Sequence, residues 1–228
     1  QTDSYRRIRN TFRYLIGNLD GFSVDEKIDE NEFPDLEKYI LHRLWEIDQK
    51  IQESIKTFNF HYMFTTLLNF CSNDLSAFYF DIRKDVIYCD GKKSIERRSS
   101  RTLLDIIFNY LVRWLAPSLS FTTEEAWKAR DNKSSIHLED FLKTPDSYKN
   151  PKISNTWIIL KQIRKVITGA LEKKREEKII GSSLEAHIDV YLEKQVLETV
   201  KNYQLDEISI TSSFALHEIN SKSVGFSL

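Results

Sequence analysis

Apolar residues recur every three or four positions through the first two-thirds of this sequence, and this spacing constrains the fold more than any other feature. Such a period is typical of amphipathic helices, each of which buries one face. The first stripe consists of Tyr5, Ile8, Phe12, Leu15 and Leu19. The second consists of Leu36, Ile40, Leu44, Ile47, Ile51 and Ile55. We therefore expect a bundle of several long helices.

Turn-forming residues between the stripes indicate where these helices end. Asp20-Gly21 closes the first helix, and Pro34 fits the first turn of the second. The acidic segment between them, residues 20–34, is typical of a loop, and "CDGKKS" (89–94) is typical of a turn. We expect helices over residues 5–19, 34–55, 59–82, 94–115, 122–130 and 154–178.

The pattern changes after residue 131, where linker-like stretches such as "KTPDSYKNP" (143–151) interrupt the helical period. Residues 181–192 alternate as a strand does, residues 194–203 favour a short helix, and residues 207–219 favour a second strand. The predicted fold class is mainly α. We expect a helical bundle over residues 1–145, followed by a junction with a long helix and a small α+β unit over residues 146–228.

One stretch, "NDLSAFYFDIRKDVIYCD" (73–90), combines aromatic and charged residues in an unusual way. We expect the aromatic run 78–80 to anchor the end of the third helix in the core. The charged residues that follow are expected to fix the turn that presents the fourth helix. These charged residues are Asp81, Arg83, Lys84 and Asp85.

Several classes of protein are excluded by what the sequence lacks. No apolar run approaches the roughly 20 residues that a membrane-spanning helix needs, and the first residues lack the apolar region of a secretory signal. Cys71 and Cys89 do not make a disulfide framework or a zinc pair, so we expect a reducing, cytoplasmic setting and no metal. The sequence has no nucleophile elbow and no glycine-rich phosphate loop, so no catalytic residue is assigned.

The net charge is only −1, but the charges are segregated along the chain. Residues 83–101 and residues 161–178 each carry seven basic and three acidic side chains, whereas residues 25–37 carry seven acidic side chains and one lysine. Segregation of this kind fits a protein with one basic face. Alternatively, the segments interleave in space and their charges cancel.

The candidate phosphate-binding residues lie in three of the predicted helices. Arg97, Arg98 and Arg101 crowd the first turns of the fourth helix, where the helix dipole disfavours positive charge, so each needs an anionic partner. Phosphates could supply it, but so could an internal ion pair, and Arg98 is well placed to meet Asp81 or Asp85. The other candidates are Arg6, Arg9 and Arg13 in the first helix, which could also form a solvated face, and Lys161, Arg164 and Lys165 in the long helix.

Long stretches of the sequence resemble the C-terminal part of bacterial-type isoleucyl-tRNA synthetases. They are "YRRIRNTFRYLIGNLDGF" (5–22), "FHYMFTTLLNFCSNDLSAFYFDIRKDVIYCD" (60–90), "SIERRSSRTLL" (94–104), "LAPSLSFTTEEAW" (115–127) and "IGSSLEA" (180–186). The resemblance covers most of residues 1–190. Arg101 departs from it, since glutamine is common there, as do Val86 and Ser120, which stand where arginine and proline are common.

The resemblance implies an anticodon-binding helical bundle and a small junction domain, with an isoleucine-accepting tRNA as the partner. The parent enzyme would use ATP and magnesium to attach isoleucine to its tRNA. The His-x-Gly-His and Lys-Met-Ser-Lys-Ser motifs of its active site, and its cysteine-rich zinc module, are missing here. We therefore expect a fragment with no cofactor of its own, inactive alone and monomeric. The alternatives are a helical protein-interaction scaffold and the equivalent domain of a valyl- or leucyl-tRNA synthetase.

Overall fold

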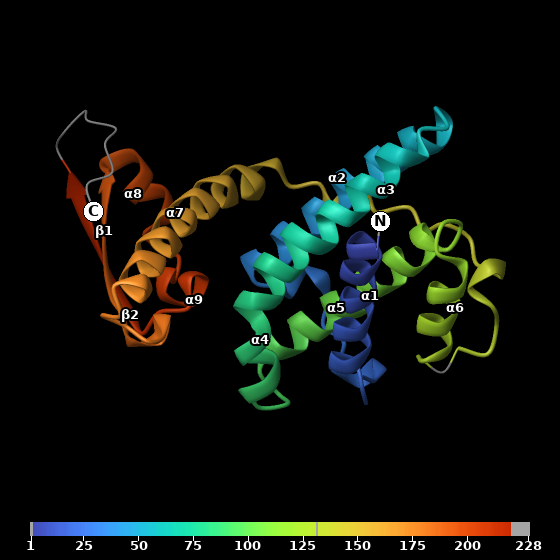
Figure 1. The fold of residues 1–228 in the computed structure, drawn as a ribbon, viewed down its shortest axis with the longest axis horizontal. Helices are drawn as coiled ribbons and strands as arrows, with labels where there is room; N and C mark the ends of the chain where they lie inside the picture. Colours follow the sequence, from blue (N-terminus) through green and yellow to red (C-terminus); the bar gives the residue numbers. More distant parts are fainter. Residues whose placement is uncertain (1, 131, 220–228) are drawn as a thin grey trace. The chain divides into compact units, whose positions relative to one another are not determined.

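The structure is a computed structural model that describes residues 2–130 and 132–219. The chain divides into two compact units, residues 1–151 and residues 152–228 (Figure 1). The first unit is a bundle of helices, and the second combines a long helix with a small parallel sheet. The predicted fold class, mainly α with a small α+β unit, is confirmed. None of the helices in the described part of the chain is long and apolar enough to cross a membrane.

The helices of the first unit follow the periodic stripes of the sequence. They are α1 (Thr2–Asn18), α2 (Asp35–Lys56), α3 (Phe60–Asn69), α4 (Phe80–Cys89), α5 (Ile95–Leu115) and α6 (Ser120–Lys128). Short 3-10 turns cover Val24–Glu26, Glu30–Glu32, Ile136–Leu138 and Asp146–Tyr148. The acidic segment 20–34 is a loop that contains two of these turns, as predicted.

A π-helical segment, Phe70–Tyr79, joins α3 to α4, so that one continuous helical rod runs from Phe60 to Cys89. The aromatic residues 78–80 are buried in the core, as expected, and Tyr14 of α1 stacks on Phe80 with 4.1 Å between ring centroids. The third helix, expected to end at residue 82, continues through the charged residues that follow and ends at Cys89. They fit a helix since Arg83 faces the core while Lys84 pairs with Asp81 one turn away on the outside.

A buried ion pair explains why the helix tolerates Arg83 in its apolar face. The Arg83 guanidinium donates from Nε to Oε1 of Glu37 at 2.7 Å and from Nη2 to Oε2 at 2.9 Å. Glu37 is fully buried, and its Oε1 also accepts hydrogen bonds from the hydroxyls of Tyr79 and Ser100. The network links α2, the continuous rod and α5. Two charges can be buried here because each has several hydrogen-bond partners.

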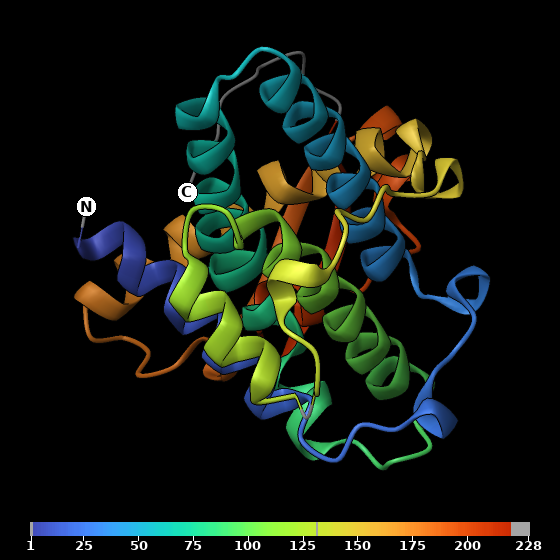
Figure 2. The same cartoon turned by 90° about the vertical axis from the view of Figure 1, so that its right-hand side faces the viewer.

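Helix α5 forms the centre of the first unit and packs against α1, α2, α4 and α6 (Figure 2). Every residue from Ser99 to Asp105 and from Tyr110 to Leu115 is buried. Phe108 meets the edge of Phe12 from α1 at 6.2 Å. A large apolar side chain buried in this way contributes about 1.5–3 kcal/mol to folding.

The segment before the second unit is anchored to α2 and to the loop that precedes it. The Tyr148 hydroxyl donates to Glu30 at 2.6 Å, and the backbone amide of Asn150 donates to Nδ1 of His42 at 3.0 Å. Thr144 donates twice to Asp48, from its backbone amide and from its hydroxyl. Because of these contacts the division between the units falls after residue 151, whereas the sequence analysis placed it after residue 145.

The second unit is built on α7 (Pro151–Glu176). The other elements are β1 (His187–Glu193), α8 (Lys194–Val200), α9 (Leu205–Ser209) and β2 (Ser213–Ile219). The strands are parallel, with His187 opposite Ser213 and Glu193 opposite Ile219. Parallel strands need a crossover connection, and α8 and α9 supply it. The expected strand–helix–strand order is therefore present.

Candidate nucleic-acid interface

Helix α1 presents its predicted arginines outward, on a face beside its apolar stripe. Arg6, Arg9 and Arg13 are all exposed. Arg9 is held near α6, because Nη1 donates to the Tyr5 hydroxyl at 3.3 Å and Nη2 lies 3.4 Å from Oε1 of Glu125. Arg6 and Arg13 have neither a hydrogen bond nor an ion pair with any described side chain or backbone group. They are available to an anion outside the fold.

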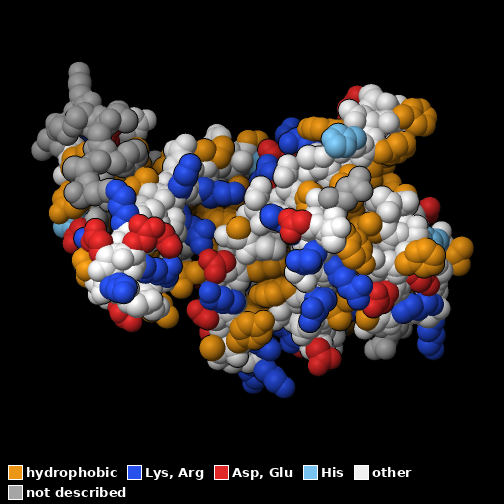
Figure 3. Space-filling view, viewed as in Figure 1, with side chains coloured by type: hydrophobic (Ala, Val, Ile, Leu, Met, Phe, Trp, Pro, Cys, Tyr) orange, Lys and Arg blue, Asp and Glu red, His pale blue; other side chains and the backbone are white. Residues whose placement is uncertain are grey.

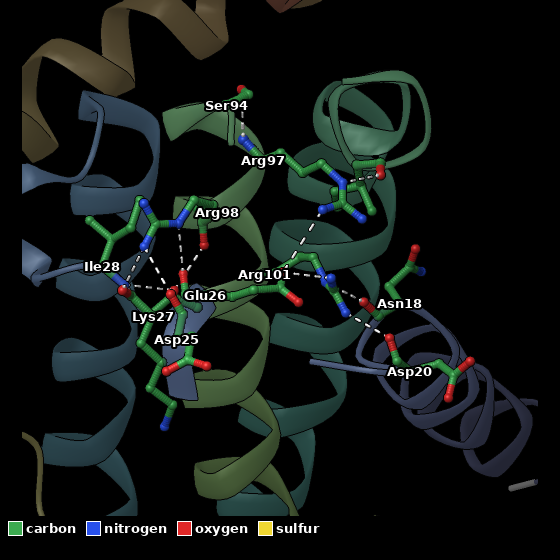
Figure 4. Close-up of polar contacts among 12 residues, drawn as sticks. Asn18, Asp20, Asp25, Glu26, Lys27, Ile28, Ser94, Arg97, Arg98 and Arg101 are labelled. Carbon is green, nitrogen blue, oxygen red and sulfur yellow. Dashed lines mark hydrogen bonds and ion pairs between the residues drawn. The ribbon is translucent and has the colours of Figure 1, made fainter. Parts of the chain in front are cut away.

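The arginines at the start of α5 are engaged inside the protein instead (Figure 4). Arg98 donates from Nε to the backbone carbonyl of Glu26 at 3.1 Å and from Nη2 to those of Asp25 and Lys27, each at 3.2 Å. The predicted pairing of Arg98 with Asp81 or Asp85 is therefore wrong. The acidic loop folds over the first turns of α5, so its carbonyl oxygens reach the guanidinium before any side chain of α4 does.

Arg101 is the most enclosed of the candidate residues, with only 6% of its side chain exposed. It donates to the backbone carbonyls of Asn18 at 3.1 Å and Asp20 at 2.7 Å, and its Nη1 lies 2.6 Å from Oε2 of Glu26. Burial lowers the pKa of Arg101 from its ordinary value, and the carboxylate of Glu26 acts in the opposite direction. Asn18 ends α1, so the guanidinium meets carbonyl groups at the negative end of that helix.

Arg97 is less exposed than Arg6 and Arg13 but less enclosed than Arg101. Its Nε donates to the backbone carbonyl of Ile87 at 3.2 Å, and its Nη1 lies 3.8 Å from the same Glu26 oxygen that binds Arg101. The side chain is 16% exposed. Glu26 thus faces two arginines at once. One carboxylate leaves part of their combined positive charge uncompensated at the surface of this end of the bundle.

The segregated charges were expected either to form a basic face or to interleave in space and cancel. The structure contains both arrangements, in different places. At the start of α5 the acidic loop interleaves with the basic segment and neutralises much of it, and Lys27 of the loop pairs in turn with Asp105 at 3.0 Å. Along α1 no such interleaving occurs for Arg6 and Arg13 among the described residues. Basic side chains are visible over α1 and the adjoining end of α4 in Figure 3.

The turn between α4 and α5 adds residues that the sequence analysis did not select. Lys92 and Lys93 are exposed, and Tyr88 beside them exposes 65% of its surface. Their signal in the sequence was the turn "CDGKKS", which carries two adjacent lysines. Exposed lysines can hold phosphates, and an exposed aromatic ring can stack on an unpaired base. The end of the bundle formed by α1, α4 and α5 therefore combines both kinds of contact.

The three candidates of α7 belong to the second unit. Arg164 donates from Nε to the backbone carbonyl of Ile208 at 2.8 Å, which ties α7 to α9. Lys161 is half-buried and Lys165 is exposed. Lys165 is thus the most accessible of the three.

The described residues offer no alternative site with evident chemistry. No group of three or more His, Cys, Asp or Glu side chains in residues 2–130 and 132–219 is arranged to hold a metal ion. Burial raises the pKa of the Cys71 thiol to about 12, which leaves it protonated and unreactive at neutral pH. The strongest candidate is therefore the basic end of the helical bundle.

Comparison with known proteins points to the same kind of site. Residues 37–192 match a family described as "Anticodon-binding domain of tRNA ligase". The chain is 48% identical over 226 residues to an isoleucine–tRNA ligase of Pelagibacter ubique, a match that covers 97% of this chain and 25% of the relative. The isoleucine–tRNA ligases of Zymomonas mobilis and Caulobacter vibrioides are 43% and 42% identical, and each match covers 94% of this chain.

These relatives are much longer than the chain described here. The chain spans about a quarter of the length of the curated relatives it matches, since the matches cover 25%, 24% and 22% of them. Each match falls in the C-terminal region of the relative.

Proposed function

The chain belongs to the family of anticodon-binding domains of tRNA ligases, and on this premise we propose that it is the tRNA-binding part of an isoleucine–tRNA ligase. The observation that carries the proposal is the near full-length match of this chain to isoleucine–tRNA ligases at more than 40% identity. Its ligand is the anticodon arm of an isoleucine-accepting tRNA. The parent enzyme would use ATP and magnesium to attach isoleucine to that tRNA, and would act as a cytoplasmic monomer.

The exposed basic residues are the phosphate-binding groups in this proposal. Arg6 and Arg13 of α1, with Lys92 and Lys93 at the start of α5, are accessible and have no internal partner among the described residues. Phosphate contacts fix the position of the RNA but do not read its sequence. Reading needs unpaired bases, and Tyr88 offers the exposed ring on which a base of the anticodon loop can stack.

The internally bound arginines have a supporting role. Arg98 and Arg101 hold the acidic loop against α5, and Arg9 links α1 to α6. Arg101 also joins the start of α5 to the end of α1 at Asn18. Arg97 keeps 16% of its side chain exposed and remains a candidate for a direct phosphate contact. In the second unit, Lys165 is the candidate for direct contact, Lys161 is half-buried, and Arg164 positions α7 through α9.

A titration with two RNAs tests the proposal. The fragment is expected to bind isoleucine-accepting tRNA more tightly than a tRNA of the same fold whose anticodon has been replaced. Replacing Arg6 and Arg13 together with alanine should weaken binding to both RNAs by a similar factor of about ten, since two phosphate contacts are lost. Arg7→Ala is the matched control, because it removes one positive charge of the same helix that is already paired with Asp3.

The outcomes separate the proposal from its alternatives. Equal affinity for the two tRNAs would exclude anticodon reading by this chain. No measurable affinity for either RNA would favour a protein-interaction scaffold. A pyrophosphate-exchange assay with isoleucine should show no turnover by the fragment, whereas turnover would contradict the assignment of catalysis to the rest of the parent.

A further inference from the structure

Three aromatic rings lie exposed within five residues at the turn between α2 and α3. Phe58 exposes 78% of its surface, Phe60 56% and Tyr62 46%. Phe58 and Phe60 meet edge to face with 6.2 Å between their centroids. We call residues 56–62 the aromatic tip. Large apolar side chains that cluster at the surface in this way mark an interaction site more often than single exposed ones do.

The backbone of the tip shows that Phe58 occupies a position that glycine fills at lower cost. Phe58 has a positive φ of 55°. Its amide donates to the carbonyl of Ile55 at 3.3 Å, and the amide of Asn59 donates to that of Ser54 at 2.8 Å. This pair of bonds is the Schellman motif, whose left-handed residue is usually glycine because a side chain is strained there.

Hydrogen bonds at the end of α2 and at the start of α3 fix the backbone of the aromatic tip. The Asn59 side chain accepts a hydrogen bond from the amide of Tyr62 at 3.2 Å and so begins α3 immediately after the turn. The Thr57 hydroxyl donates to the carbonyl of Glu53 at 2.9 Å at the end of α2. Two capped helices therefore hold the rings in place, although the fold of the first unit does not bury them.

The aromatic tip carries little positive charge, which favours a protein surface over RNA as the partner that covers it. Lys56 is the only residue of the tip with a permanent charge. RNA affinity depends on several phosphate contacts. The other end of the rod leads into the turn that carries the exposed Lys92 and Lys93.

Helix α1 begins at the same end of the bundle as the tip. Thr11 hydrogen-bonds Cys71, and Tyr14 stacks on Phe80, so α1 crosses the rod with its first residues on the side where the rod begins at Phe60. The relatives matched by this chain carry about three-quarters of their length outside the match, which falls in their C-terminal region. A segment that precedes α1 in the parent would therefore enter the bundle from the side on which the rod begins.

We propose that the aromatic tip is a docking surface for the preceding part of the same polypeptide, with Phe58 and Phe60 inserted into an apolar pocket of that part. The proposal rests on the proposed function, because the relatives that define the missing length are isoleucine–tRNA ligases. The docking would fix the orientation of this bundle relative to the rest of the enzyme. The strain at Phe58 is then offset by apolar contacts that form only in the parent.

Amide hydrogen exchange over residues 58–62 tests the docking, measured in the full-length parent and in the present fragment without tRNA. We expect exchange at least tenfold slower in the parent. Phe58→Gly with Phe60→Ala should restore fast exchange in the parent. In the fragment, Phe58→Gly alone should leave the melting temperature unchanged or raise it, since it relieves the left-handed strain. Val24→Ala, an exposed apolar residue at the other end of the bundle, is the matched control.

Three results would overturn the proposal. Equal exchange in the parent and the fragment would mean that nothing covers the tip. Protection only after tRNA is added would make RNA the occupant, and protection of the fragment that grows with its own concentration would indicate a second copy. The comparison of the parent with the fragment is made without tRNA, so its result does not depend on tRNA affinity. If the tip is protected in the parent but the fragment does not bind tRNA, the proposed function is contradicted and the docking of the tip is not.

Discussion

Glu37 and Arg83 show how a single buried contact determines the behaviour of a whole segment. Glu37→Gln removes the charge that Arg83 meets and weakens the hydrogen bonds from Tyr79 and Ser100. We expect a loss of about 3–5 kcal/mol in the free energy of unfolding, measured by urea denaturation, because a buried cation loses its counterion. Lys84→Gln is the control.

Lys84 lies one residue further along the same helix, in an ion pair whose side chains are 43% and 36% exposed. Its replacement should change the free energy of unfolding by less than about 1 kcal/mol, as is usual for exposed pairs. Similar losses in the two variants would show that Arg83 is solvated in solution.

If Arg97 contacts an RNA phosphate, as proposed, the carboxylate of Glu26 competes with that phosphate. Glu26→Gln removes the negative charge shared by Arg97 and Arg101. We expect tRNA affinity to increase by about twofold to threefold at 0.1 M salt, the effect of one charge acting over roughly 10 Å in a solvated setting. Glu32→Gln removes the same charge from the same loop without a contact to these arginines. An equal gain in both variants would assign the effect to net charge alone.

At the scale of the elements, His42 connects α2 to the segment before the second unit. Burial lowers the pKa of His42 from its ordinary value of 6.5, and the ring accepts a hydrogen bond from the amide of Asn150. The folded protein therefore binds a proton at His42 less readily than the unfolded protein does. Stability contributed by neutral His42 is therefore present above pH 6.5 and is lost as the pH falls from there towards the folded pKa.

Thermal unfolding between about pH 7.5 and about pH 5 measures this dependence. His42→Gln should remove part of the decrease in melting temperature that wild type shows on acidification. The exposed His61 offers the matched control, since His61→Gln should preserve the decrease. If both variants follow wild type at every pH, the Asn150 contact does not depend on the protonation of His42.

The helices of this fold were predictable because their apolar periods are long and regular. The ends set by Asp20-Gly21 and by Ser94 lie close to those observed, since local chemistry determines them. What could not be predicted depends on partners distant in sequence. The charged run after residue 80 continues as helix because Arg83 pairs with Glu37, which lies 46 positions earlier. Arg98 binds backbone carbonyls of a loop, and no side-chain pattern indicates a carbonyl acceptor.

The candidate site was predictable only in part, for the same reason. The sequence identifies arginines, but their exposure depends on how the acidic loop folds over α5. The sequence does not show which of Arg13 and Arg101 is exposed. In the structure Arg13 is exposed, whereas only 6% of the Arg101 side chain is exposed. The turn that contains Lys92 and Lys93 has no sequence signal that separates a binding surface from a solvated connection.

At the scale of the whole molecule, the first unit carries both the buried network and the proposed phosphate contacts. A chain ending at residue 151 should keep its helical circular dichroism and a cooperative thermal transition, since the contacts of α5 lie within it. We expect it to retain tRNA affinity within about tenfold of the full fragment. A larger loss would place most of the RNA contacts on the second unit, around Lys165.

The most direct test of the account is the salt dependence of tRNA binding, compared between exposed and enclosed basic residues. Each phosphate contact adds roughly 0.7–0.9 to the slope of log affinity against log salt concentration. Replacing Arg6, Arg13, Lys92 and Lys93 together with alanine should flatten the slope by about 3. Arg101→Ala should lower the melting temperature and leave the slope of the folded protein unchanged. A slope that Arg101→Ala flattens, and that the fourfold replacement does not, would contradict the proposed interface.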